Sequence, residues 1–153
     1  MRKRNLKNHS QDLNLMDRQV DTQKYLEFVD GVTSQESKDY IAFNSRCFEI
    51  QKDPDAIPVH RLLTAALGIC AEGGEFTEVV KKMVFQGKPV NDENIFHMKR
   101  ELGDIMWYVA QACMSLDTTI DEIIEMNVEK LEKRYPGGSF SVEKSEVRAK
   151  GDR

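Results

Sequence analysis

The sequence has few of the residues that cross-link or interrupt a fold. Its 153 residues include three cysteines, four prolines and one tryptophan. Cys47, Cys70 and Cys113 show no close spacing and no motif, so we expect three buried, reduced thiols. No apolar run approaches the length of a membrane span, and the N-terminus lacks the apolar core of a signal peptide. These absences predict a cytoplasmic protein without a membrane partner, and the length is sufficient for one domain with its own core.

The charge is also unremarkable for a soluble protein. The formal net charge is −4, so the surface as a whole is not built for nucleic acid. Arg2, Lys3, Arg4 and Lys7 form a short basic arm, which we expect to be a solvated terminus. The predicted organisation is a flexible basic arm over residues 1–20, a single domain over residues 21–138 and a flexible, charged tail over residues 139–153.

Helical spacing organises the middle of the chain. Between His60 and Phe85, apolar residues alternate spacings of three and four, and Gly87 and Pro89 then end the helix. The same spacing returns from Asp92 to about Asp117. The expected seams are Leu62, Ala66, Ile69, Phe76, Val80 and Met83 in the first helix, and Ile95, Met98, Leu102, Ile105, Val109, Ala112 and Leu116 in the second.

Shorter segments flank this helix pair. Residues 38–50 look helical, with Ser34 upstream as a candidate N-cap. After the pair, Thr119 and Glu122 match a capping box that starts a last helix, which stops at Tyr135. The pattern predicts an all-α protein, an antiparallel helical bundle.

Two pairs of acidic residues follow the edges of the predicted seams. At about 100° per residue, Glu72 lies near −80° and Glu75 near −140° from the first seam, whereas Glu78 falls on the far side. In the second helix, Glu101 lies at about −60° and Asp104 at about −120°. A short loop makes the helices antiparallel, so these two edges meet. The pairs lie about 12 residues before and about 11 residues after the loop, which is a mismatch of less than one turn.

Four converging carboxylates predict a metal site. Like charges raise each other's pKa and oppose folding unless a cation compensates them. Oxygen-only ligands favour Mg²⁺ or Mn²⁺ over zinc, and two such ions can orient a phosphate and activate water. The alternatives are ordinary solvated helix faces or a di-iron or di-manganese carboxylate bundle. The second would require Glu-x-x-His, which neither Glu72 nor Glu101 begins.

Three segments together resemble a known family. The runs AEGGEFTEVVKK, RELGDIMWY and NVEKLEKRYPGG, within residues 60–140, resemble the MazG-like nucleoside triphosphate pyrophosphohydrolases. The family pattern is Glu-x-x-Glu followed by Glu-x-x-Asp, which matches Glu72, Glu75, Glu101 and Asp104. The segment YLEFVDGVTSQESKDY also resembles phage-encoded members.

The resemblance implies an activity and a ligand set. It implies that these four acids bind Mg²⁺ and that a (deoxy)nucleoside triphosphate is cleaved between its α- and β-phosphates. It also implies a homodimer or homotetramer. The phosphate-contacting positions of the family match Lys130 and Arg134, with Asn127 ahead of them. The alternative is that the lysine and the arginine bind no ligand and instead extend along the apolar surface and cap the C-terminal end of the helix.

Further roles are expected for residues near the acids. We expect Glu75 to orient or deprotonate the attacking water. Tyr108 shares the metal stripe and would contact the base or the sugar, or else form a rim of the core. His97 shares that stripe too, but we expect a solvated side chain, and we expect Trp107 to lie in the core. The competing functions are a non-enzymatic helical interaction module that uses the basic arm, and a nucleotide- and metal-binding sensor without turnover.

Overall fold

The computed structural model describes residues 20–53 and 56–147, and these residues form helices and no strand. The predicted all-α fold is confirmed. The predicted basic arm, apart from Val20, and the last six residues of the predicted tail lie outside the described residues. The chain divides after Arg46 into two parts, which are described here one at a time.

The first part contains helix α1 (Thr22–Val32), the single turn α2 (Gln35–Lys38) and most of α3 (Tyr40–Ile50). The Asp21 side chain caps α1 by accepting a hydrogen bond from the backbone N–H of Lys24 at 3.1 Å. Ser34 stands at the N-cap of α2, although its side chain makes no capping hydrogen bond there. The helix predicted over residues 38–50 is α3, and Asp39 accepts from the backbone of Ala42 at its start.

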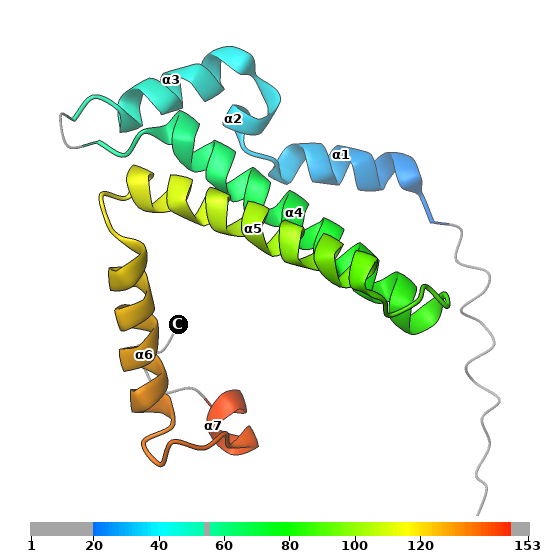
Figure 1. The fold of residues 1–153 in the computed structure, drawn as a ribbon. Coiled ribbons are helices and arrows are strands. Elements are labelled where there is room, and N and C mark those ends of the chain that lie inside the picture. Colours follow the sequence, from blue (N-terminus) through cyan, green and yellow to red (C-terminus); the bar gives the residue numbers. More distant parts are fainter. Residues whose placement is uncertain (1–19, 54–55, 148–153) are drawn as a thin grey trace, which may run out of the picture. The chain divides into compact units, whose positions relative to one another are not determined.

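The second part is built on the hairpin of α4 (Val59–Phe85) and α5 (Asp92–Ser115), which lie antiparallel side by side (Figure 1). A short connection reverses the chain. Gly87 takes a φ of +71°, where a side chain would be strained, and the backbone N–H of Lys88 reaches back to the carbonyl of Lys82 at 3.1 Å. Because the loop is short, it fixes the depth at which residues of the two helices meet.

Asn94 holds the entrance to α5. Its amide Nδ2 donates to the carbonyl of Pro89 at 2.7 Å, and its backbone N–H donates to the Asn91 side chain, the N-cap, at 3.0 Å. Asn94 is buried, so both bonds satisfy groups that would otherwise lose water at a cost. The predicted end of the first helix and start of the second are both confirmed.

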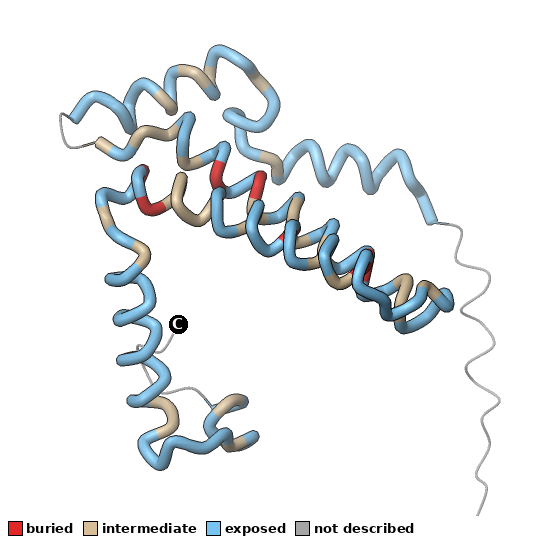
Figure 2. Tube along the Cα trace, in the orientation of Figure 1, coloured by how far each residue is buried: buried red, intermediate tan, exposed pale blue. Residues whose placement is uncertain are grey.

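The most buried track of the hairpin runs beside the predicted seam, most of whose residues are half-buried (Figure 2). On α4 it passes through Ala65, Gly68, Glu72 and Val79, and the predicted Ala66 and Val80 are exposed. On α5 the pattern is clearer, since every seventh residue from Asn94 is buried or half-buried and polar, while the predicted Leu102 and Leu116 are exposed. The polar track consists of Asn94, Glu101, Tyr108 and Ser115.

Helix α6 (Ile120–Arg134) follows a turn in which Asp117 has a φ of +49°. The capping box is confirmed in both directions, with Thr119 Oγ1 accepting from the backbone of Glu122 at 3.1 Å and Glu122 accepting from the backbone of Thr119 at 2.9 Å. A short helix that the hydropathy pattern did not indicate, α7 (Val142–Glu146), forms inside the predicted tail. None of the described helices is both long and apolar enough to cross a membrane.

Candidate metal centre

Glu101 is the most enclosed carboxylate on the hairpin. It occupies the polar track of α5 and is 6% exposed, whereas Asp104, one turn on, is exposed. From α4, Glu72 is half-buried and Glu75 is exposed. A buried carboxylate is costly unless it is paired or binds a cation. The four predicted ligands therefore differ in exposure, since one is buried, one is half-buried and two face solvent.

The structure brings all four predicted ligands into two groups of three that share Glu101. Oxygens of Glu72, Glu101 and Asp104 all lie within 4.8 Å of one another, and so do ligand atoms of Glu75, His97 and Glu101. Two ligand atoms at about 2.1 Å from one ion lie about 3–4 Å apart, so small side-chain rotations would complete either group. The donor set fits a divalent cation, and its carboxylates favour a hard one.

The mutual repulsion of these groups is visible at Glu72. Desolvation at the helix interface, followed by the charges of Glu75, Asp104 and Glu101, raises the pKa of the Glu72 carboxyl above its usual value. A hydrogen bond with Glu101 acts in the same direction. A cation bound here would offset this repulsion, as expected for a metal site rather than for four solvated carboxylates.

His97 is exposed, as predicted, and it also contacts an acidic residue. Its Nε2 lies 2.9 Å from Oε1 of Glu101, one helical turn away on α5. The sequence signal was present, because His97 and Glu101 are separated by four residues and so share a helix face. The sequence placed His97 on the metal stripe, but it did not show that the ring would contact Glu101.

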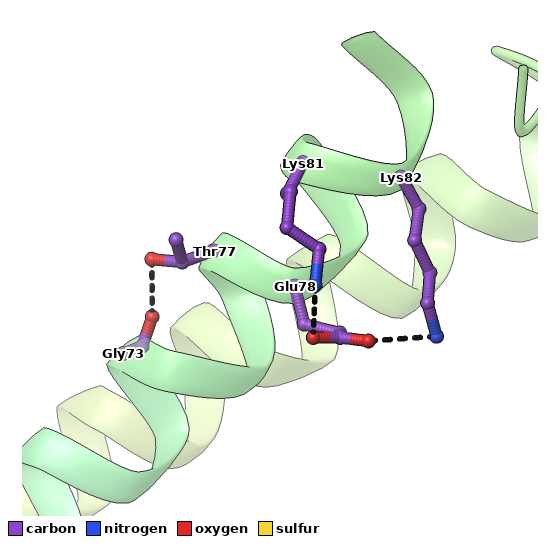
Figure 3. Close-up of polar contacts among 5 residues, drawn as sticks. All are labelled: Gly73, Thr77, Glu78, Lys81 and Lys82. Atoms are coloured by element: carbon purple, nitrogen blue, oxygen red, sulfur yellow. Dashed lines mark hydrogen bonds and ion pairs between the residues drawn. The ribbon is translucent and has the colours of Figure 1, made fainter. Parts of the chain in front are cut away.

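Glu78 stays outside the centre, as predicted. Its carboxylate pairs with Lys82 Nζ at 2.8 Å and with Lys81 Nζ at 2.9 Å (Figure 3). Hydrogen bonds from these two lysines lower the pKa of Glu78 to about 2. Neighbouring Thr77 donates to the carbonyl of Gly73 at 2.7 Å, a local bond within α4. Glu78 is thus a matched acidic control for the ligands on the same helix.

Tyr108 and Trp107 sit one turn beyond the acids. The Tyr108 ring lies against Gly68, so closely that a Cβ on Gly68 would overlap three ring carbons. Trp107 meets this ring edge-on, with centroids 4.8 Å apart. The indole is 55% exposed, so the prediction that Trp107 belongs to the core is wrong for this chain. Sequence reasoning missed Gly68, because a glycine in an apolar helix gives no sign of what approaches it.

The residues predicted to contact phosphates lie on α6, not on the hairpin. Asn127 and Lys130 are exposed and Arg134 is half-buried. Beside them, the end of α6 and the following turn enclose an apolar hollow of about 360 Å³. Tyr135 and Phe140 close it, with ring centroids 5.9 Å apart. The hollow contains none of the predicted site residues and is not part of the carboxylate centre.

The prediction of unpaired thiols holds for all three cysteines, but the prediction of burial holds for one only. All three thiols are free, and Cys113 is buried in the hairpin, but Cys47 is half-buried and Cys70 is exposed. The prediction of buried thiols is therefore wrong for Cys70, which lies on an exposed face of α4.

Two comparisons with known proteins bear on this centre. The family model of the MazG nucleotide pyrophosphohydrolase domain matches residues 61–139, a span that includes α5, α6 and all of α4 except its first two residues. The chain is also similar to the Gene 37 protein of Mycobacterium phage L5, at 34% identity over 85 residues, which is 55% of this chain and 75% of that protein. That relative is encoded by a phage, in agreement with the expected resemblance to phage-encoded members. No solved structure matches the chain.

Proposed function

Because the chain belongs to the MazG nucleotide pyrophosphohydrolase domain family, we propose that it hydrolyses a ribo- or deoxyribonucleoside triphosphate to the monophosphate and pyrophosphate. In this proposal the reaction requires Mg²⁺, for which Mn²⁺ can substitute, and Glu72, Glu75, Glu101 and Asp104 hold the metal. The observation that supports it most strongly is that buried Glu101 belongs to both ligand groups.

The proposed reaction is a displacement by water at the α-phosphorus. The water oxygen forms the new bond to the α-phosphorus, the bond to the bridging oxygen breaks, and pyrophosphate leaves with that oxygen. Glu75, exposed at the edge of the centre, accepts the proton of the attacking water. A divalent cation, when bound, neutralises the phosphate charge and lowers the pKa of bound water.

The remaining predicted residues act on the substrate in this proposal. Lys130 and Arg134 hold the leaving pyrophosphate, the lysine as a point charge and the arginine as a planar fork. Asn127 lies three residues before Lys130 on the same helix and donates to a phosphate or sugar oxygen. Tyr108 contacts the sugar or the base from its place beside the carboxylates.

We also propose that the functional unit is a homodimer or homotetramer. The described residues bury no large side chain completely, and the apolar residues buried among them are Ala65, Val79 and Cys113. Large apolar side chains such as Leu67 and Leu102 face outward from the hairpin. Apolar area of this kind in one chain is characteristic of an interaction surface. Light scattering coupled to gel filtration tests this directly, and a monomer at micromolar concentration would contradict it.

The decisive experiment measures pyrophosphate release from a panel of ribo- and deoxyribonucleoside triphosphates, with Mg²⁺ and with chelator. Glu101→Gln keeps the shape of the side chain and removes its charge, so turnover should fall about 10²-fold or more. Glu78→Gln removes a carboxylate from the same surface but outside the centre, and it should leave turnover unchanged.

The same experiment separates the second candidate, a nucleotide sensor. Metal-dependent stabilisation of the wild type but not of Glu101→Gln, without release from any substrate, would support a sensor. Loss of activity in Glu78→Gln to the same extent as in Glu101→Gln would contradict the proposed centre.

A further inference from the structure

The second ligand group contains a nitrogen, which the acidic motifs alone do not supply. His97 lies four residues before Glu101 on α5, and its Nε2 is 2.9 Å from Oε1 of the buried Glu101. Glu75 reaches the same place from α4. Three side chains from two helices thus meet where a single ion can touch all of them.

The geometry agrees with ligation. Neighbouring ligands of one ion at about 2.1 Å lie about 3 Å apart, close to the separation of Nε2 and the Glu101 oxygen. His97 is partly exposed, so its ring can turn without disturbing the hairpin core. Glu101 has a second oxygen, and carboxylates bridge two ions in two-metal sites, so the two ligand groups can be filled together.

We infer that His97 is a direct ligand of a second divalent cation, held with Glu75 and shared with the first through Glu101. This inference rests on the proposed metal-dependent function. The first position has oxygen ligands only and suits Mg²⁺. The second combines an imidazole with two carboxylates. Imidazole nitrogen suits first-row transition metals better than it suits the hard Mg²⁺ ion, so this position prefers Co²⁺, and to a smaller extent Mn²⁺, over Mg²⁺.

The alternative role for His97 is to orient Glu101 through a hydrogen bond while the ion binds oxygens only. The two roles differ in one observable, a bond between metal and nitrogen. Mn²⁺ is paramagnetic, so electron spin echo modulation of the bound ion detects a directly coordinated ¹⁴N nucleus. The measurement uses the full chain without an affinity tag, titrated with Mn²⁺ alone and with no nucleotide present.

The expected result is ¹⁴N modulation in the wild type that disappears in His97→Gln. Mn²⁺ affinity should fall about tenfold or more in that variant, with a smaller change for Mg²⁺. His60→Gln is the matched control, because His60 lies on α4 away from the acids, with Nδ1 3.4 Å from Nε2 of Gln51, and its removal should change neither signal.

Each other outcome is decisive. Tight Mn²⁺ binding without ¹⁴N modulation in the wild type would overturn ligation by His97 and leave the proposed hydrolase intact. Modulation that survives in His97→Gln would also overturn it. Absence of Mn²⁺ binding in the wild type would overturn both this inference and the proposed metal centre. The wild-type spectrum alone tests the ligand, so the inference does not depend on the variant folding.

Discussion

The contact between Gly68 and Tyr108 allows a quantitative test of the hairpin. Gly68 is buried on α4, and a methyl group added there would overlap the ring carbons Cγ, Cδ1 and Cε1 of Tyr108. Gly74 is on the same helix but exposed, and a methyl group there would meet nothing within 4 Å in the described structure. Substitution by alanine therefore adds the same methyl group at both positions, but it creates a steric overlap only at Gly68.

The magnitude follows from two opposing terms. Replacing glycine by alanine inside a helix stabilises it by about 1 kcal/mol, and this gain applies at both positions. Overpacking at Gly68 costs about 1–3 kcal/mol, because the ring must move or the helices must separate. Gly74→Ala should therefore gain up to about 1 kcal/mol. Gly68→Ala should be less stable than Gly74→Ala by about 1–3 kcal/mol.

Urea denaturation at one fixed protein concentration measures this difference, with chelator present to remove any contribution from metal binding. The Tyr108→Ala background supplies the control, since without the ring Gly68→Ala should stabilise like Gly74→Ala. Equal stabilisation by the two alanines in the wild-type background would refute the close approach of α4 and α5 at Gly68.

Three further predictions concern charge and capping. Because the pKa of Glu72 is raised in the folded, metal-free protein, that state binds more protons than the unfolded chain. In the presence of chelator, folding stability should thus fall as pH rises from the usual glutamate pKa through the raised pKa of Glu72. Thermal melts at a series of pH values measure this trend. Saturating Mg²⁺ or the variant Glu72→Gln should remove it. Glu78 has the opposite effect, because its pKa is lowered to about 2 in the folded protein. Its pairs with Lys81 and Lys82 therefore stabilise the fold above the usual glutamate pKa, and this stabilisation is lost as pH falls toward 2. Glu78→Gln should make stability less dependent on pH in this acid range, and an unchanged dependence would contradict the assignment. Thr119→Ala removes one half of the capping box of α6 and should cost about 1 kcal/mol in urea denaturation, with Thr119→Ser as the variant that should retain stability.

Helical spacing in the sequence was sufficient to place the candidate ligands. The angles expected from the seam rank their exposure correctly. Glu101, expected at about −60°, is buried, and Glu72, at about −80°, is half-buried, whereas Asp104 and Glu75, at about −120° and −140°, are exposed. The short loop between the two helices fixed the position along the hairpin at which the acidic pairs meet. Side-chain direction and helix period are local properties, so they can be deduced without a structure.

The same reasoning placed part of the apolar seam one residue away from the helix contact that the structure shows. Hydropathy assigned Leu102 to the helix contact and left Glu101 at its edge, but the structure buries Glu101 and exposes Leu102. A hydropathy pattern reports which residues avoid water in the final assembly, not which helix covers them. The outward-facing leucine agrees with the proposed contact with a second copy, which one chain alone cannot show.

The sequence by itself determined helices α3 to α6, the capping box of α6, the hairpin and the approach of two acidic pairs, because backbone propensity, capping and helix period act between residues that are close in the chain. Only the tertiary structure decided that Glu101 is buried, that His97 reaches it, and that Tyr108 lies on Gly68. These facts depend on the rotation and separation of two packed helices, and that packing is set by shapes contributed from both of them.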